Sequence, residues 1–475
     1  MRYQNSSLIG PILLLAACGA RSSLDAPSGS VGGSTTSGGT SPIGGTPSTG
    51  GVQSAAGAMN TGGATGGNLS VGGVTSTGVA PNTGGTTTTG GTTLTGGSES
   101  TGGATNTGGT TVTGGTVGSG GTSGTGAIIS AITAGNNFTC AVVNGGLQCW
   151  GDNSYGELGN NSTTESHVPV QVQGLTSGVT AVAAGSEHIC AVVNGGAQCW
   201  GDNSYGKLGN NSTIESHVPV QVQGLTSGVT AIAAGSYYSC AVVNGGVQCW
   251  GNNNRGELGD NSTIESHVPV RVLSLTSGTT AIAVNCGYTC AVVNGGVQCW
   301  GNNSTGPSGG DSTTGSPVPV QVQGLTSDVT AVSAGCMHTC AVVNRGMQCW
   351  GWNQFGQLGD GSSIDRPVPV QVQGLTSDVT AAAAGDIFSC AVVSGGVQCW
   401  GWNTSGSLGN NSTTQSDIPV QVQGLTSDVA TIAAGDAHAC AVVNDIAYCW
   451  GVDSYGALGN NATTTSYVPV RVQFP

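Results

Sequence analysis

A segment that ends in Cys-Trp-Gly recurs along this chain at a fixed interval of 50 residues. It first appears as CAVVNGGLQCW at residues 140–150, and near-copies end in six further tryptophans, Trp200, Trp250, Trp300, Trp350, Trp400 and Trp450. A period of about 40 to 50 residues is typical of propellers and solenoids, in which each repeat buries its apolar face against its neighbours. We therefore expect an array of seven similar units.

Each unit contains four short runs rich in Val, Ile and Ala, separated by clusters of Gly, Asn and Ser. Such runs predict strands, and four strands in each of seven units predict an all-β, seven-bladed propeller with four-stranded antiparallel blades. The alanine-rich run TAIAAG is expected nearest the central channel, and the proline of VPVRV favours an edge strand. In this interpretation blades coincide with repeats. A ring closed by pairing the C-terminal strand into the first blade is the alternative, and a β-solenoid is the rival architecture.

The unit AAGSEHICAVVNGGAQCWGDNSYGKLGNNSTIESHVPVQV resembles the regulator of chromosome condensation repeat, whose hallmarks are G-x-x-H, W-G-x-N, G-Q-L-G and P-x-x-V. The resemblance covers about residues 128–475 and implies a seven-bladed propeller. Two departures stand out. The fourth unit reads GPSGGDS from Gly306, and the usual histidine remains only in three units. It is present at His188, His338 and His438 and replaced by Phe138, Tyr238, Tyr288 and Phe388.

The paired cysteines of the first unit flank a hairpin signal. Asn-Gly, as at 144–145, is the strongest short signal for a two-residue type I′ turn. Counting outward from it places Cys140 opposite Cys149 at a non-hydrogen-bonded site, where Cα atoms lie about 4.5 Å apart. That separation suits a disulfide. Zinc is the rival interpretation, but zinc fingers need shorter cysteine spacings that converge from two loops, and seven equal copies do not resemble one catalytic nucleophile.

Cys286 and Cys336 occupy the same position in adjacent units, and such positions on adjacent blades converge only near the axis of a ring. We therefore predict a disulfide between these two blades, with two free thiols as the alternative. The full set of predicted disulfide cysteines is Cys140, Cys149, Cys190, Cys199, Cys240, Cys249, Cys286, Cys290, Cys299, Cys336, Cys340, Cys349, Cys390, Cys399, Cys440 and Cys449.

The start of the chain has the layout of an export signal. An early arginine, an apolar run over residues 8–17 and small residues before Cys18 are typical of a secretory signal, and the run is too short to span a membrane. Leu-Ala-Ala-Cys at 15–18 resembles the lipobox of bacterial lipoproteins. This resemblance implies cleavage after a signal peptide at 1–17 and lipidation of Cys18, and the glycine that follows favours the outer membrane. An ordinary cleaved signal with an incidental cysteine is the alternative.

Residues 18–127 are dominated by Gly, Thr and Ser. Such a stretch has too little apolar area to offset the entropy of ordering, so it is expected to be a disordered tether for a propeller at 128–475. The net charge of −14 belongs to the propeller, because 20 acidic and six basic residues follow residue 126. A nucleic-acid surface needs clustered Lys and Arg, so nucleic acid is excluded as a partner.

The sequence offers little sign of catalysis. No Ser-His-Asp arrangement or phosphate loop stands out, and we predict no catalytic residue, no metal site and no cofactor. Glu-Ser-His recurs at 165–167, 215–217 and 265–267, but these copies lie on different blades and cannot share one ion. Asp386 and Asp436 are the only equivalent acidic pair on adjacent units in the turn after Ala-Ala-Gly.

Two sets of positions vary among the units. One lies in the turn after Ala-Ala-Gly, which is expected to crowd one rim of the channel, and the other follows Trp-Gly. Aromatic and Met surfaces with a rim Arg are typical of protein recognition, although the first set could instead pack between blades. The first set is Phe138, His188, Tyr237, Tyr238, Tyr288, Met337, His338, Phe388 and His438. The second is Tyr155, Tyr205, Arg255, Trp352, Phe355, Trp402 and Tyr455.

These features favour a non-catalytic, monomeric, lipid-anchored extracytoplasmic binding module that presents one propeller rim to a protein or glycan partner. The resembled family includes a nucleotide-exchange factor for a small GTPase and a secreted inhibitor of β-lactamase. The exchange role does not fit an exported, acidic chain. A polysaccharide-active hydrolase or lyase, which would need paired carboxylates at one rim, and a passive surface-coat protein are the alternatives.

Overall fold

The computed structural model describes residues 127–310 and 313–475. The predicted signal peptide at 1–17, the lipidation of Cys18 and the tether up to residue 126 lie outside the described residues. In the part of the chain that the structure describes, no helix could serve as a membrane span.

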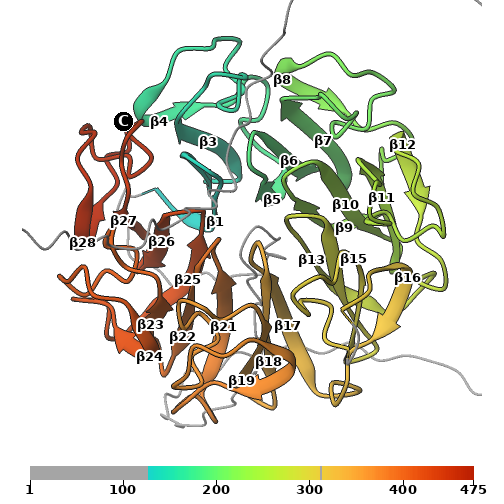
Figure 1. Cartoon of the computed structure of the whole chain (residues 1–475). Helices are drawn as coiled ribbons and strands as arrows, with labels where there is room; N and C mark the ends of the chain where they lie inside the picture. Colours follow the sequence, from blue (N-terminus) through green and yellow to red (C-terminus); the bar gives the residue numbers. More distant parts are fainter. Residues whose placement is uncertain (1–126, 311–312) are drawn as a thin grey trace, which may run out of the picture. The chain divides into compact units, whose positions relative to one another are not determined.

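The described chain forms seven four-stranded antiparallel sheets, each built from four consecutive strands (Figure 1). Blade 1 contains β1 (Ile129–Ala134), β2 (Phe138–Val143), β3 (Gly146–Gly151) and β4 (Ser166–Gln171). Blade 2 contains β5 (Val179–Ala184), β6 (His188–Val193), β7 (Gly196–Gly201) and β8 (Ser216–Gln221). Blade 3 contains β9 (Val229–Ala234), β10 (Tyr238–Val243), β11 (Gly246–Gly251) and β12 (Ser266–Arg271). Blade 4 contains β13 (Thr279–Val284), β14 (Tyr288–Val293), β15 (Gly296–Gly301) and β16 (Ser316–Gln321).

The remaining three blades repeat the same order of strands. Blade 5 contains β17 (Val329–Ala334), β18 (His338–Val343), β19 (Gly346–Gly351) and β20 (Arg366–Gln371). Blade 6 contains β21 (Val379–Ala384), β22 (Phe388–Val393), β23 (Gly396–Gly401) and β24 (Ser416–Gln421). Blade 7 contains β25 (Val429–Ala434), β26 (His438–Val443), β27 (Ile446–Gly451) and β28 (Ser466–Arg471).

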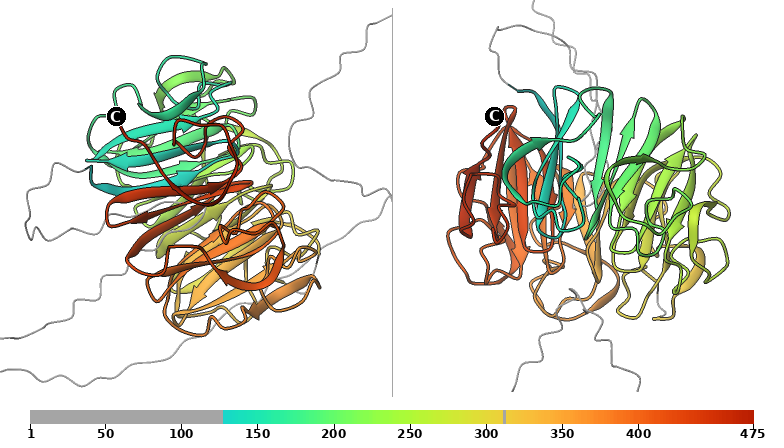
Figure 2. Two further views of the ribbon diagram at one scale, coloured as in Figure 1. Left: turned by 90° about the vertical axis from the view of Figure 1, so that its left-hand side faces the viewer. Right: turned by 90° about the horizontal axis from the view of Figure 1, so that it is seen from above.

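The blades are arranged around a central axis as a propeller, which confirms the predicted fold (Figure 1). The alanine-rich first strand of each blade lies at the channel, where a small residue fits the crowded axis, and the proline-containing fourth strand lies at the outer edge. Seen from the side, the strands run between the two ends of the ring (Figure 2). Blades coincide with repeats: β28 pairs with β27 of its own blade, so the alternative closure through the first blade is wrong.

The second and third strands of each blade form the predicted cysteine hairpin. Asn144 and Gly145 have φ values of 52° and 77°, as a type I′ turn requires, and Cys140 lies opposite Cys149. All seven hairpins carry this disulfide, with Cα atoms 4.0–4.1 Å apart. An eighth disulfide joins Cys286 of blade 4 to Cys336 of blade 5. So many disulfides indicate an oxidising, extracytoplasmic environment.

A tryptophan joins each blade to the one before it. The indole N–H of Trp200 donates to the carbonyl oxygen of Glu157, in the loop that follows the third strand of blade 1 (2.8 Å). The same bond recurs at all seven blade junctions, at 2.7–2.9 Å, and every one of these tryptophans is fully buried. A buried indole N–H needs an acceptor, and the acceptor always comes from the preceding blade. The last of these bonds, from Trp150 to Ala457, closes the ring.

At each junction a second pair of side chains also meets, and the two are either both polar or both apolar. His188 of blade 2 lies 2.8 Å from the Ser239 hydroxyl of blade 3, which donates in turn to the Lys207 carbonyl oxygen. Because the hydroxyl hydrogen is used in that way, the histidine Nε2 carries the donated proton. Where the first residue is Phe138 or Phe388, the facing residue is apolar, Ile189 or Ala439.

This matching holds at every junction around the ring. Where the first residue is His or Tyr, which can hydrogen-bond, the facing residue is always Ser or Thr; where it is Phe, the facing residue is never Ser or Thr. The two positions are 51 residues apart, except at the last junction, where His438 of blade 7 faces Thr139 of blade 1. The polar pairs are His188–Ser239, Tyr238–Thr289, Tyr288–Thr339, His338–Ser389 and His438–Thr139. Each polar side chain at these junctions therefore has a facing partner, although the Nδ1 atoms of His188 and His338 are buried without one in the described part of the chain.

Thr139→Val is predicted to leave the buried Nε2–H of His438 without an acceptor. We expect a loss of about 1–3 kcal/mol in the free energy of unfolding, measured by urea denaturation under non-reducing conditions. Adding His438→Phe recreates the apolar pairing found at Phe138 and Phe388, so the double variant should recover most of the loss. Strictly additive effects in this double-mutant cycle would contradict the matching.

Candidate functional site

The two variable sets of positions share one end of the propeller. The first and third strands of an antiparallel blade run in the same direction, so the turn after the first and the loop after the third emerge together. Backbone bonds join them: Asp152 N–H donates to Asn137 (2.9 Å) and Trp352 N–H to Met337 (2.9 Å). We call this end the loop rim; it comprises the turns at 135–137, the loops at 152–165 and their equivalents in the other blades.

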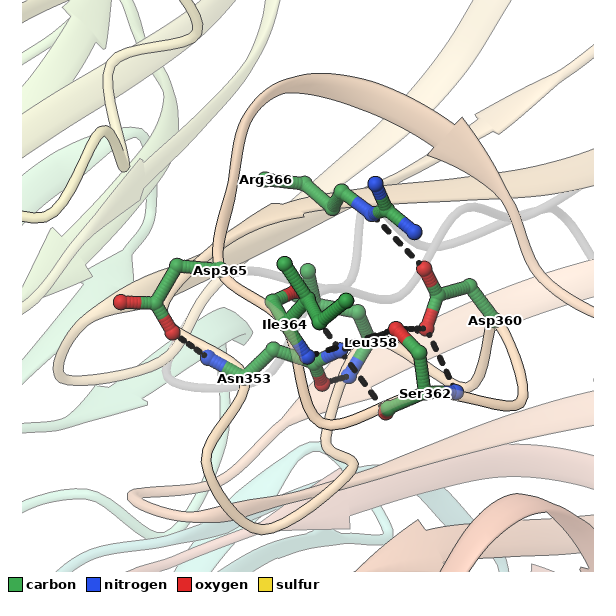
Figure 3. Close-up of polar contacts among 7 residues, drawn as sticks. All are labelled: Asn353, Leu358, Asp360, Ser362, Ile364, Asp365 and Arg366. Atoms are coloured by element: carbon green, nitrogen blue, oxygen red, sulfur yellow. Dashed lines mark hydrogen bonds and ion pairs between the residues drawn. The ribbon is translucent and has the colours of Figure 1, made fainter.

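A buried asparagine fixes the conformation of the rim loop in six blades, and Asp453 takes its place in blade 7. In blade 5 the Asn353 side chain donates to Asp360 Oδ1 (3.2 Å) and to the carbonyl oxygens of Ser362 (3.0 Å) and Ile364 (3.1 Å) (Figure 3). Its oxygen accepts the Leu358 N–H (2.9 Å). The carboxamide of Asn353 thus fixes the conformation of a loop that contains no strand. Equivalent residues in the other blades are Asn153, Asn203, Asn253, Asn303, Asn403 and Asp453.

Most of the first predicted set is not at the surface. The side chains that follow the rim turns enter the junctions described above, where their bonds or apolar contacts are made with the next blade. Their exposed fractions are 0–1%. These buried residues are Phe138, His188, Tyr238, Tyr288, His338, Phe388 and His438. The prediction that they form a recognition ring is therefore wrong, and only Tyr237 (46% exposed) and Met337 (36% exposed) of this set face solvent.

The second predicted set lies on the loop rim, and three of its aromatic residues form one cluster. The Phe355 ring packs edge-on against Trp352 (centroids 5.2 Å apart) and against Trp402 of the next blade (4.6 Å). All three side chains are half-buried, so part of each ring remains in contact with solvent. We call these residues the aromatic trio. Tyr155, Tyr205, Tyr455 and Arg255 are exposed elsewhere on the rim.

An acidic sector occupies the rim over blades 1 to 3 and consists of Glu157, Glu187, Asp202 and Glu257. Lys207 is completely buried there, with its Nζ 2.5 Å from Asp202 and 4.0 Å from Glu187, and it lies 5.9 Å from the centroid of the Tyr237 ring. Burial raises the pKa of the nearby Glu157 carboxyl to about 7. The sequence did not identify Lys207 as part of this sector, because its contacts come from separate segments: Asp202 and Glu187 belong to blade 2, and Tyr237 belongs to blade 3.

Asp386 and Asp436 lie at the narrow mouth of the channel. They line a cavity of about 30 Å³ together with glycines and alanines of the inner strands, which is room for about two water molecules. Burial raises the pKa of Asp386 to about 6, and burial together with the charge of Asp386 raises that of Asp436 to about 8. The structure therefore brings the predicted acidic pair together, in a space too small for a sugar ring.

The histidine and glutamate of each repeated Glu-Ser-His segment contact each other within blades 1, 2 and 3. His167 lies 3.0 Å from Glu165, and the pairs in blades 2 and 3 are at 3.1 and 3.2 Å. Across residues 127–310 and 313–475, no group of three or more His, Cys, Asp or Glu side chains is placed to hold a metal ion.

The raised pKa values predict how stability depends on pH. A carboxyl whose pKa is higher in the folded than in the unfolded state stabilises the fold at low pH; this contribution declines as the pH rises above the ordinary carboxyl pKa of 3.8 and is fully lost above the folded values of about 6 and 8. Asp436→Asn should therefore raise the melting temperature at pH 8.5 by about 2–4 °C and leave it nearly unchanged at about pH 3. Asp445→Asn, the same charge change at an exposed turn, is the control; equal shifts in both variants would contradict the prediction.

The repeats of this chain match the models of a known protein family. The family model described as Regulator of chromosome condensation (RCC1) repeat matches residues 144–192, 194–242, 244–293, 294–342, 349–392 and 394–442. A second model of the same repeat matches residues 129–157, 179–207 and 229–257. No curated protein sequence matches the chain.

Two solved structures show the same fold. Prp20p from Saccharomyces cerevisiae is 22% identical, with a TM-score of 0.61 over 73% of this chain and 87% of Prp20p. Human WBSCR16 is 23% identical, with a TM-score of 0.57 over 65% of this chain and 84% of that protein. The repeat model matches more than half of the residues, and the structure has seven complete blades. The chain therefore belongs to the RCC1 repeat family.

Proposed function

We propose that this protein is a non-catalytic, extracytoplasmic binding module that presents its loop rim to a protein partner. The observation that carries the proposal is the aromatic trio: three large rings from two blades, partly exposed on loops that internal hydrogen bonds hold in place. Aromatic clusters are enriched at the energetic centres of protein interfaces. A preorganised surface also loses little conformational entropy on binding.

The printed descriptions of two structures of one relative support a protein as the partner. Prp20 has been solved bound to Kap60, and Prp20p is described with its binding to Gsp1p and histones. The acidic sector on the same rim favours a partner with basic groups. A glycan is the second candidate, because the exposed faces of Trp352 and Trp402 can also stack on sugar rings.

The polysaccharide-active alternative depends on Asp386 and Asp436, and their position argues against it. A glycosidase needs both carboxyl groups beside a sugar held between them. These two face a cavity of only about 30 Å³. The passive-coat alternative differs from our proposal in one observable respect: it predicts no saturable partner.

Trp352→Ala/Trp402→Ala should abolish capture of the partner by the immobilised protein. Both substitutions remove half-buried rim side chains, and hot-spot aromatics typically contribute about 2 kcal/mol or more each. We expect at least a tenfold loss of the captured protein from envelope extracts, quantified by mass spectrometry.

Ile264→Ala removes an exposed apolar side chain (75% exposed) outside the trio and serves as the matched control. Unchanged near-ultraviolet circular dichroism would show that the variants are folded. If the double variant and the control capture the same proteins in the same amounts, the trio is not the binding surface. If no protein or glycan binds saturably, the passive-coat alternative holds.

We further propose that Cys18 is lipidated and anchors the propeller outside the cytoplasm, with residues 18–127 as a tether. Leu-Ala-Ala-Cys at 15–18 and the preceding apolar run support the anchor. The eight disulfides support the extracytoplasmic location. About 100 flexible residues have a root-mean-square span of roughly 55 Å, which would let the rim reach partners away from the membrane.

Cys18→Ser should release the protein from the membrane fraction when it is expressed in a Gram-negative bacterium. The wild-type chain should fractionate with the outer membrane and carry the mass of a lipidated N-terminal cysteine. Gly19→Asp is a matched variant that keeps the anchor but is expected to move it to the inner membrane. A wild-type mature protein with an unmodified Cys18 would contradict lipidation.

A further inference from the structure

A glutamine closes the end of the propeller opposite the loop rim in five blades. In blade 1 the Gln171 Nε2 donates to the carbonyl oxygens of Leu147 (2.9 Å) and Leu175 (2.8 Å) and lies 3.2 Å from that of Val172. Each of these carbonyls also accepts a backbone N–H, so the carboxamide uses their second lone pairs. The same three contacts are made by Gln221, Gln321, Gln371 and Gln421.

Blade 3 lacks this closure. Its sequence reads VRVLSL where the five other blades read VQVQGL, so Arg271 replaces the glutamine. The turn changes with it: Leu273 is 45% exposed, and Ser274 takes a positive φ of 66° where the other blades have glycine. Blade 7 also has an arginine at this position, Arg471, but blade 3 alone combines the arginine with a Leu-Ser turn, and the adjoining segments of the repeats are almost identical.

The missing carboxamide leaves a pocket. It has a volume of about 220 Å³ and is lined by Val247, Gln248, Arg271, Val272 and Leu275 among others. The carbonyl oxygens of Val247 and Leu275 keep their backbone bonds, to Val272 N–H (3.0 Å) and Val247 N–H (2.9 Å). Among the described residues, no side chain donates to their second lone pairs, and the Arg271 guanidinium has no hydrogen-bond or ion-pair partner.

We infer that this pocket binds a small molecule or chain end that carries both a primary carboxamide and a carboxylate. The carboxamide takes the place of the glutamine side chain, with its two N–H groups on the Val247 and Leu275 carbonyl oxygens. The carboxylate pairs with the guanidinium of Arg271, whose planar fork suits it. The five other blades indicate which group fits here, because in each of them a glutamine carboxamide occupies the same pair of carbonyl oxygens, which we call the carbonyl cradle.

N-acetyl-L-glutamine is the probe, titrated into the disulfide-intact protein by isothermal calorimetry. We expect one site with a dissociation constant of about 1 mM or tighter. N-acetyl-L-glutamate has almost the same shape but replaces the two N–H donors with a charged acceptor, so it should bind at least tenfold more weakly. Equal binding of the two probes would overturn the inference, since the carbonyl cradle would then play no part.

Arg271→Gln rebuilds the closure found in the five other blades and should abolish binding without harming the fold. Arg471→Gln is the matched control: it makes the same change of charge at the equivalent position of blade 7, where Phe474 and Pro475 replace the Gly-Leu of the cradle turn. Gln171→Arg should open a second site in blade 1 and raise the stoichiometry towards two. Retained binding in Arg271→Gln, or loss in Arg471→Gln, would show that the probe binds elsewhere. The Trp352→Ala/Trp402→Ala variant should bind the probe normally, which separates this site from the loop rim.

Discussion

The ring depends on one backbone carbonyl at each junction. In the Gly-x-Leu-Gly segment, which reads Gly-Pro-Ser-Gly in blade 4, the oxygen of residue x accepts the indole N–H of the next blade's tryptophan. At five junctions it also accepts a Ser or Thr hydroxyl. Because a backbone group makes the joint, the side chain of residue x is free to change. It is Glu157, Lys207, Pro307 or Ala457 without loss of the bond. The invariant part of the repeat therefore builds the ring, and the variable part sets the chemistry of the rim.

Ring closure follows from the same joint. Many propellers gain closure by pairing strands from both ends of the chain, but here blade 7 is complete by itself. Blade 1 is instead held by Trp150 on Ala457 and by Thr139 between His438 and Ala457. Phe474 adds an edge-on contact to Trp150 (centroids 5.8 Å apart). The indole bond joins each of the other pairs of blades, and the hydroxyl contact recurs at four of the six other junctions. The seventh junction therefore resembles the others and is supplemented by the C-terminal phenylalanine.

Local patterns in the sequence were sufficient to predict the strands, the hairpins and the disulfides. Asn144-Gly145 determines the register that places Cys140 opposite Cys149, and nothing outside the hairpin is needed. The rim was harder to predict, because a position that varies between repeats can still be buried. Phe138 and His188 differ between repeats, yet each change is compensated by the facing residue, Ile189 or Ser239, in the next blade. A comparison of positions 51 residues apart could have found this pairing. Lys207 and Arg271 gave no such signal, since their roles depend on turns brought together only by the fold.

The arrangement of the rim limits what kind of partner can use it. The aromatic trio belongs to blades 5 and 6 and the acidic sector to blades 1 to 3, so the two surfaces lie on different sides of the channel (Figure 1). The loops that carry them are fixed by Asn353 and its equivalents and cannot fold inward to meet. A small ligand can therefore contact one surface but not both. Only a partner wide enough to cross the channel mouth could combine apolar contacts at Trp352 and Trp402 with basic groups opposite Asp202 and Glu187, which favours a folded protein domain over a single sugar or a short peptide.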